Sequence, residues 1–174
     1  AVLQGPPGTG KTSFTLAPAV LARIAAVAAD NRELVTVVTA PSHTAVDEAM
    51  DDIVENWAAY TAERDDLENI DFVRIGSQDN TSTGSASAPS PVDTHVDQID
   101  YYDSADVHHM ADLLRPHVSS EDESASHLVM FSTPTSLRGV MDKCAGDLFG
   151  LDGAEEIMDA GISFVDLLAI DEAS

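Results

Sequence analysis

Short apolar runs alternate along the chain with longer stretches whose apolar residues recur every three or four positions. The short runs are rich in valine, isoleucine and leucine, and this pattern predicts buried strands. The longer stretches predict helices that each turn one face toward a sheet. The strands are expected at residues 1–4, 34–40, 71–76, 127–132 and 164–170, and the helices at 11–29, 44–67, 104–114, 136–149 and 155–159.

This alternation predicts an α/β fold: a mostly parallel sheet with helices on both faces. In such sheets, ligands bind beyond the carboxyl ends of the strands. Polar segments directly follow several of the predicted strands, beginning at Gly5, Pro41, Thr133 and Asp171. We therefore expect the functional site at this edge of the sheet.

Two of the predicted helices carry local signals. Pro18 lies inside the first one, where it removes a hydrogen bond and is expected to kink the helix. In the second, Thr44 and Asp47 have the spacing of a capping box. The acidic residues of this helix lie off its apolar stripe and predict a solvated face rather than a metal site: Asp47, Glu48, Asp51, Asp52 and Glu55.

Residues 77–126 have a different composition from the rest of the chain. Residues 77–91 consist almost entirely of small, polar and proline residues, which cannot build a core, and residues 92–126 remain acidic. We expect one domain over 1–174 with 77–126 as a flexible insertion. Five of the six histidines lie between positions 95 and 127, and because no pair has i, i+4 spacing we favour a polar, mobile loop over a metal site: His95, His108, His109, His117 and His127.

The sequence GPPGTGKT at residues 5–12 matches the phosphate-binding pattern G-x-x-x-x-G-K-[ST] at every specified position. Its glycines allow successive backbone N–H groups to turn inward around a polyphosphate. Lys11 would place its charge on the β and γ phosphates, and the Thr12 hydroxyl would ligate Mg²⁺. The motif predicts ATP and Mg²⁺ as ligands, with a simple glycine-proline turn as the alternative. The expected nucleotide-binding residues are Gly5, Pro6, Pro7, Gly8, Thr9, Gly10, Lys11, Thr12 and Ser13.

Two carboxylates, Asp171 and Glu172, follow the last predicted strand. A carboxylate at this position can hold Mg²⁺, and its neighbour can deprotonate a water for attack on the γ phosphate. Asp171 fits the first role and Glu172 the second. With Lys11 they form the expected catalytic set, while Thr12 and Asp171 form the expected metal site. The alternative is a helix cap at a strand end.

The charge of the chain is strongly negative, with 31 acidic residues against 8 basic ones and a formal net charge of −23. A nucleic-acid-binding protein usually shows a basic footprint. Either this protein binds no polyanion, or it works at molar salt, where the Debye length is about 3 Å and an acidic surface hardly repels DNA. Scarce lysine beside abundant alanine, valine, threonine and aspartate is typical of the second case, and we favour a halophilic archaeal source.

The sequence also predicts where the protein is located and whether the chain is a fragment. Cys144 is the only cysteine, so no internal disulfide can form. No apolar run reaches the roughly 18 residues of a transmembrane helix, and a cytoplasmic location is the default. The chain lacks a starting methionine and opens almost directly on the phosphate loop, so we expect a fragment without a signal peptide.

Four blocks of the sequence resemble motifs of superfamily 1 helicases, most closely the type that includes nonsense-mediated-decay and Okazaki-fragment-processing helicases. QGPPGTGKT at 4–12 resembles motif I, TAPSHTAVDEAM at 39–50 resembles motif Ia, and FSTPTSL at 131–137 resembles the next nucleic-acid motif. LLAIDEAS at 167–174 resembles motif II. The resemblance implies a RecA-like P-loop NTPase, here part of the first motor domain of a helicase or translocase.

The resemblance also implies a single-stranded DNA or RNA partner. Hydroxyls and backbone N–H groups at helix starts bind phosphates without reading bases. Some of the hydroxyls could equally be helix caps: Ser42 or Thr44 in one helix, and Thr135 or Ser136 in another. The residues expected near the nucleic-acid backbone are Pro41, Ser42, His43, Thr44, Thr133, Pro134 and Thr135.

The chain departs from the family in three respects. Motifs III to VI and the upstream adenine-reading glutamine motif are absent, and the 77–126 stretch is longer and more acidic than expected. We therefore expect a second RecA-like domain to complete the ATP site, and an isolated fragment that is nearly inactive. A strand that normally follows motif II is also absent, so the predicted strands at 1–4 and 164–170 would each present an open edge.

Two other readings remain. One is an AAA+ ATPase, which shares the phosphate-loop sequence, although the 159 residues between Thr12 and Asp171 are more than a plain module of that type needs. The other is a non-catalytic nucleotide-binding module, against which the intact Lys11 and Glu172 argue.

Overall fold

The computed structural model describes residues 15–30, 32–61, 70–76, 100–102, 107–118, 126–163 and 165–171. The expected nucleotide-binding residues and Glu172 lie outside this part of the chain. The described elements, in chain order, are α1 (Ala17–Ala28), β1 (Val35–Thr39), α2 (His43–Thr61), β2 (Ile70–Ile75), β3 (Asp100–Tyr102), α4 (Val107–Val118), β4 (His127–Ser132), α5 (Pro134–Phe149), α6 (Ala154–Asp159) and β5 (Leu167–Ile170).

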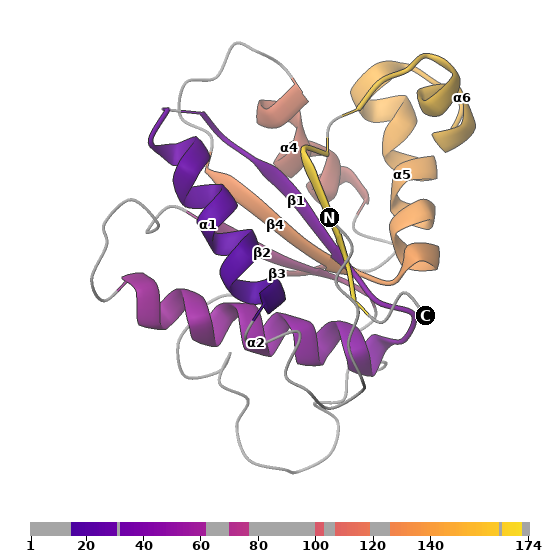
Figure 1. The fold of residues 1–174 in the computed structure, drawn as a ribbon. Helices are drawn as coiled ribbons and strands as arrows, with labels where there is room; N and C mark the ends of the chain where they lie inside the picture. Colours follow the sequence, from indigo (N-terminus) through magenta and orange to yellow (C-terminus); the bar gives the residue numbers. More distant parts are fainter. Residues whose placement is uncertain are drawn as a thin grey trace.

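The strands form one parallel sheet in the order β3-β2-β4-β1-β5 (Figure 1). This arrangement confirms the predicted α/β fold class. The register aligns the strand ends: Thr39 of β1 lies opposite both Ser132 of β4 and Ile170 of β5, and Ile75 of β2 also lies opposite Ser132. Four neighbouring strands, β2, β4, β1 and β5, therefore end at the same edge of the sheet.

Helices cover both faces of the sheet. In Figure 1, α1 and α2 lie on one face, and α4 and α5 lie on the other. The buried residues divide in the same way, because successive side chains of a strand point to opposite faces. In β1, Val38 joins the cluster formed with α1 and α2, whereas Val35 and Val37 join the cluster formed with α4 and α5. All residues of β1 and β4 are buried, so these strands form the centre of the core.

Several element bounds differ from the expected ones in instructive ways. Pro18 is the second residue of α1, and residues 15 and 16 directly before this helix are in π-helical conformation. The expected kink at Pro18 stays a prediction. Helix α2 begins at His43, and its cap is Ser42 rather than Thr44. Helix α5 begins at Pro134, two residues before the expected start, since proline suits the first turn.

Part of the 77–126 stretch is ordered. Strand β3 extends the sheet beside β2, and α4 places Met110, Ala111 and Leu114 in the core. The strand was not expected, because three residues are too few to show a period. His117 lies on α4, so the expected mobile loop is wrong for this histidine, whereas His127 begins β4 as the expected strand at 127–132 places it. The bounds of the domain and of the insertion stay predictions.

Strand β5 lies at the edge of the described sheet and pairs with β1. Its side chains Leu168 and Ile170 are each 54% exposed, although both are apolar. The expected buried strand at 164–170 is therefore shorter and, within the described residues, much less covered than its composition suggested.

Candidate functional site

The candidate site lies at the carboxyl edge of the sheet. The register places the segments that follow β1, β2, β4 and β5 beside one another. The backbone N–H of Asp171 donates to the carbonyl of Thr39 at 2.8 Å, which joins the end of β5 to the end of β1. Three of the four sequence blocks, those beginning at 39, 131 and 167, are thus brought together.

The turn after β1 presents polar groups to solvent at the start of α2. The Ser42 hydroxyl accepts a hydrogen bond from the backbone N–H of Ala45 at 3.2 Å, which caps the helix. Pro41, Ser42 and Thr44 are exposed, and His43 is partly exposed. The first turn of α2 therefore offers backbone N–H groups, hydroxyls and an imidazole within one short segment.

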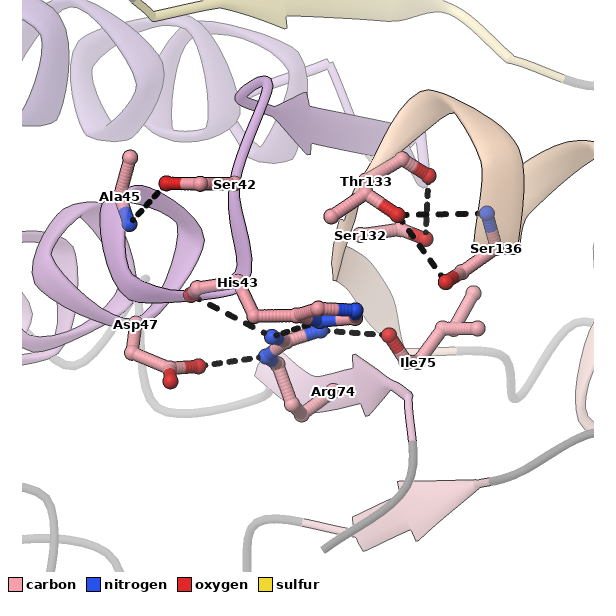
Figure 2. A network of polar contacts seen from close by, with 9 residues as sticks. All are labelled: Ser42, His43, Ala45, Asp47, Arg74, Ile75, Ser132, Thr133 and Ser136. Atoms are coloured by element: carbon pink, nitrogen blue, oxygen red, sulfur yellow. Dashed lines mark hydrogen bonds and ion pairs between the residues drawn. The ribbon is translucent and has the colours of Figure 1, made fainter. Parts of the chain in front are cut away.

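The turn after β4 is built in a similar way at the start of α5 (Figure 2). The Thr133 hydroxyl accepts from the Ser136 backbone N–H at 3.3 Å and donates to the Ser136 hydroxyl at 3.0 Å. Thr133 is buried and caps α5, so the cap is neither Thr135 nor Ser136. Pro134 and Thr135 are exposed, and they form the accessible part of this turn.

A buried arginine, Arg74 of β2, joins this strand to the start of α2 (Figure 2). It is completely buried, and its Nε lies 2.7 Å from Asp47 Oδ1. Its Nη2 lies 3.1 Å from His43 Nδ1, and its Nη1 donates to the carbonyl of Ile75. The expectation of a solvated face is therefore wrong for Asp47, which is 6% exposed and holds a buried ion pair.

Sequence reasoning did not single out Arg74. One signal was available: an arginine stands in the apolar run DFVRIG at 71–76, where a buried strand was expected. Arginine and aspartate are rarely fully buried unless they are paired. A basic residue inside a predicted core strand should therefore prompt a search for a buried acidic partner.

Asp171 is the described member of the expected magnesium site. It is partly exposed at the end of β5, and its carboxylate has the oxygen donors that Mg²⁺ prefers. Its place beyond a strand end, at the same edge as the two helix starts, fits the expected role. Thr12 and Glu172 lie outside the described residues, and so do all of the nucleotide-binding residues from Gly5 to Ser13.

The groups with shifted pKa values lie away from this edge. Burial lowers the pKa of His117, against the raising effect of the charges of Glu33, Asp71 and Asp166. Burial also lowers the pKa of His127, and the nearby His117 lowers it further. Strands β2, β4 and β5 begin near these groups, so they mark the amino edge of the sheet. Within the described ranges, no cluster of three or more His, Cys, Asp or Glu residues could hold a metal ion.

Comparison with known proteins places the chain in a family. Residues 1–140 match the family model described as an AAA domain, and this match includes the phosphate loop and the segments before α2 and α5. No curated protein and no solved structure shows a significant match. In the part of the chain that the structure describes, no helix is long and apolar enough to cross a membrane. The chain therefore belongs to the AAA domain family and has an α/β RecA-like P-loop ATPase fold of the helicase type.

Proposed function

We propose that this chain is the ATP-binding part of a motor domain that couples ATP hydrolysis to movement along single-stranded DNA or RNA. The observation that carries the proposal is the alignment of strand ends. Strands β4, β1 and β5 are neighbours and end at one edge of the sheet. The start of α5, the start of α2 and the carboxylate of Asp171 follow these three strand ends. A site for a nucleic-acid backbone and a site for a nucleotide would then share the central strand β1.

The ATP site would be built from the phosphate loop and the strand β5 end. Backbone N–H groups of the loop would hold the phosphates, and Lys11 would place its ammonium group on the β and γ phosphates. Thr12 and Asp171 would hold Mg²⁺, which supplies charge neutralisation on the phosphate oxygens when it is bound. Glu172 would accept a proton from the water that attacks the γ phosphorus, so that the bond to the β–γ bridging oxygen breaks and ADP and phosphate leave.

The nucleic-acid site would lie along the two helix starts. One part of this site would be formed by exposed Pro41, Ser42 and Thr44 with the partly exposed His43, and the other part by exposed Pro134 and Thr135. Contacts from hydroxyls and backbone N–H groups hold phosphates and carry no base information, so binding should be independent of sequence. Thr133 would act indirectly, because its hydroxyl is engaged in capping α5.

Communication between the sites would pass through the ends of β1 and β5. The hydrogen bond from Asp171 N–H to the Thr39 carbonyl ties the metal-binding strand end to the strand that leads into Pro41 and Ser42. A shift of the β5 end during hydrolysis would therefore displace the turn that contacts nucleic acid. Such small shifts between packed elements are a common way of coupling two sites.

The wider setting of this function also belongs to the proposal. A second RecA-like domain would supply the arginine that stabilises the transition state, a contribution of roughly 10³ to 10⁵ in rate. We propose a helicase of the nonsense-mediated-decay or Okazaki-processing type, a haloarchaeal source and a cytoplasmic location. The four motif-like blocks support the helicase type, and the acidic composition supports the haloarchaeal source.

The nucleotide part is tested by calorimetry with Mg-ATP in high salt. Wild type should bind, and Lys11→Ala should show no detectable binding, because the lysine charge on the phosphates is lost. Equal affinity of the two proteins would contradict the phosphate-loop assignment.

The nucleic-acid part is tested by fluorescence anisotropy with a labelled oligothymidylate. Ser42→Ala and Thr135→Ala should each weaken binding several-fold, while Ser163→Ala serves as the matched control. Ser163 is an exposed hydroxyl residue that precedes β5, at the opposite edge of the sheet. Because the chain has few basic residues, the dependence of affinity on salt should be shallow. Equal affinity of all four proteins would contradict the proposed interface.

A further inference from the structure

The contact between Arg74 and His43 has a chemical consequence for the proposed interface. Arg74 Nη2 lies 3.1 Å from His43 Nδ1, and His43 is the first residue of α2, beside exposed Ser42 and Thr44 (Figure 2). We propose that Arg74 is a positioning residue that fixes the His43 ring with its proton on Nε2, so that this N–H donates to a phosphate of single-stranded nucleic acid. The proposal rests on the proposed function, since it names a phosphate donor within that interface.

The assignment of the proton follows from the donor inventory. A guanidinium has only donors and stays charged in proteins, so Nη2 cannot accept a hydrogen bond. His43 Nδ1 must therefore be the acceptor, which requires an unprotonated Nδ1. A neutral imidazole carries one proton, and it then lies on Nε2. The bond inside the protein thus decides which ring nitrogen can donate to a ligand.

Arg74 can impose this choice because it is itself held on several sides. It is completely buried, its Nε donates to Asp47 Oδ1 at 2.7 Å, and its Nη1 donates to the carbonyl of Ile75. The same Nη2 that faces the ring also lies 3.5 Å from the His43 carbonyl. The guanidinium plane is therefore fixed relative to both β2 and the start of α2.

The helix geometry makes the arrangement possible. His43 and Asp47 are four residues apart, so they lie on the same side of α2 and reach one guanidinium. Gly76 leaves room for the group: a Cβ there would stand 3.1 Å from Arg74 Nη1 and 3.4 Å from the His43 ring. The Nδ1 side of the ring thus faces Gly76 and Arg74, and the proposal assigns the Nε2 side to an incoming phosphate.

A purely structural role for Arg74 predicts a different outcome. If Arg74 only joined β2 to α2 through Asp47, loss of its bond to His43 would change stability and leave the ring's proton and the nucleic-acid affinity unaffected. The two roles are separated by a spectroscopic readout on the ring together with a binding measurement. Arg74→Lys keeps a positive charge for Asp47 but lacks the planar set of donors that reaches three groups at once.

The ring is observed by long-range ¹H–¹⁵N correlation spectroscopy on the whole chain, because the nitrogen shifts distinguish a protonated from an unprotonated nitrogen. Without nucleic acid, His43 of wild type should carry its proton on Nε2. Arg74→Lys should show exchange between both tautomers, while Arg115→Lys, a change at an exposed arginine of α4, should match wild type. An Nδ1–H tautomer in wild type, or an unchanged ring in Arg74→Lys, would overturn the inference.

Binding to oligothymidylate is measured on the same proteins. Arg74→Lys should weaken it roughly three- to tenfold, the size expected for one misplaced hydrogen bond, and Arg115→Lys should not. If wild type binds and Arg74→Lys binds equally well despite a changed ring, the link to nucleic acid is wrong. If wild type fails to bind while the ring behaves as expected, the proposed function fails and the tautomer assignment stands.

A second variant covers the case in which Arg74→Lys does not fold. His43→Asn leaves the Arg74–Asp47 pair in place and keeps an acceptor near the position of Nδ1, but it has no donor at the position of Nε2. Once circular dichroism shows an unchanged fold, this variant should bind oligothymidylate at least threefold more weakly than wild type. Equal affinity would overturn the assignment of the donor.

Discussion

The two edges of the sheet carry different chemistry on the same framework. At the carboxyl edge, Ser42, Thr133 and Arg74 make defined hydrogen bonds that shape two exposed helix starts. At the amino edge, the half-buried His117 and the buried His127 lie among titratable groups, and His127 Nδ1 has no hydrogen-bond partner among the described residues. In the proposed function, polar groups at the first edge hold a ligand, whereas those at the second are expected to influence how stability depends on pH.

The strongest test of this comparison removes one side of the buried ion pair at the carboxyl edge. Asp47→Ala leaves the completely buried Arg74 without this carboxylate, and loss of one partner of a buried pair costs about 3–5 kcal/mol of unfolding free energy. The matched control is Asp112→Ala, whose pair with Arg115 is exposed and should contribute about 0–1 kcal/mol. Urea unfolding measures both changes, and equal losses would contradict the importance given to the buried pair.

A smaller effect is expected from Gly76→Ala at the same edge. The glycine has a φ of +153°, and an added Cβ would press against Arg74 Nη1 at 3.1 Å. Strain of this kind costs about 1–3 kcal/mol. Gly139→Ala in α5 is the control, because open space surrounds that position and alanine favours a helix by roughly 1 kcal/mol. The two substitutions should therefore shift the thermal midpoint in opposite directions; a shift in the same direction would refute the strain argument.

The histidines at the amino edge should make the free energy of unfolding depend on pH. The folded-state pKa values of His117 and His127 lie below the ordinary value of 6.5 because burial disfavours the charged rings. As the pH falls, the unfolded chain binds protons at these histidines before the folded chain does. Above about pH 6.5 the histidines therefore do not affect the free energy of unfolding, and they lower it as the pH falls from there through their folded-state pKa values. His117 faces Glu33, Asp71 and Asp166, whose charges oppose this effect without reversing it.

Urea unfolding between about pH 7.5 and 5 measures this dependence, and the variant His117→Gln isolates the histidine contribution from that of the carboxylates. The fall in stability should be shallower in His117→Gln than in wild type. A steeper fall in His117→Gln would mean that the carboxylates, rather than burial, dominate this histidine.

The last prediction concerns Cys144, which is buried in α5. Burial and the charge of Asp147 raise the pKa of its thiol to about 11. Since only the thiolate reacts, alkylation at about pH 8 should be very slow in the folded protein and fast in urea. Rapid alkylation under native conditions would show that this part of α5 opens easily.

The sequence predicted the framework better than it predicted the details of the site. Strand β4 has the expected bounds, since HLVMFS is an unbroken buried run, and the helices after β1 and β4 begin within two residues of their expected starts. Strand β3 escaped prediction because its partner, β2, rather than its own three residues, defines it.

The errors inside the site have a common physical cause. Asp47 was expected in water because it lies among other acidic residues, and only the folded chain shows that Arg74 reaches it from 27 positions away. Ser42 and Thr44 both have side chains that can cap a helix, and the exit direction of β1 decides between them. Long-range pairing and chain direction are properties of the fold, so local spacing could not supply either one.

The pair of contacts that Arg74 makes with α2 also bears on how this helix finds its place during folding. Consecutive residues of a helix differ by about 100° around its axis. A rotation of α2 by one residue would turn both His43 and Asp47 away from β2 and leave a buried guanidinium without its carboxylate. An apolar stripe tolerates some rotation, but this pair does not. Arg74 therefore selects one azimuth for α2, and with it the direction in which the exposed first turn faces.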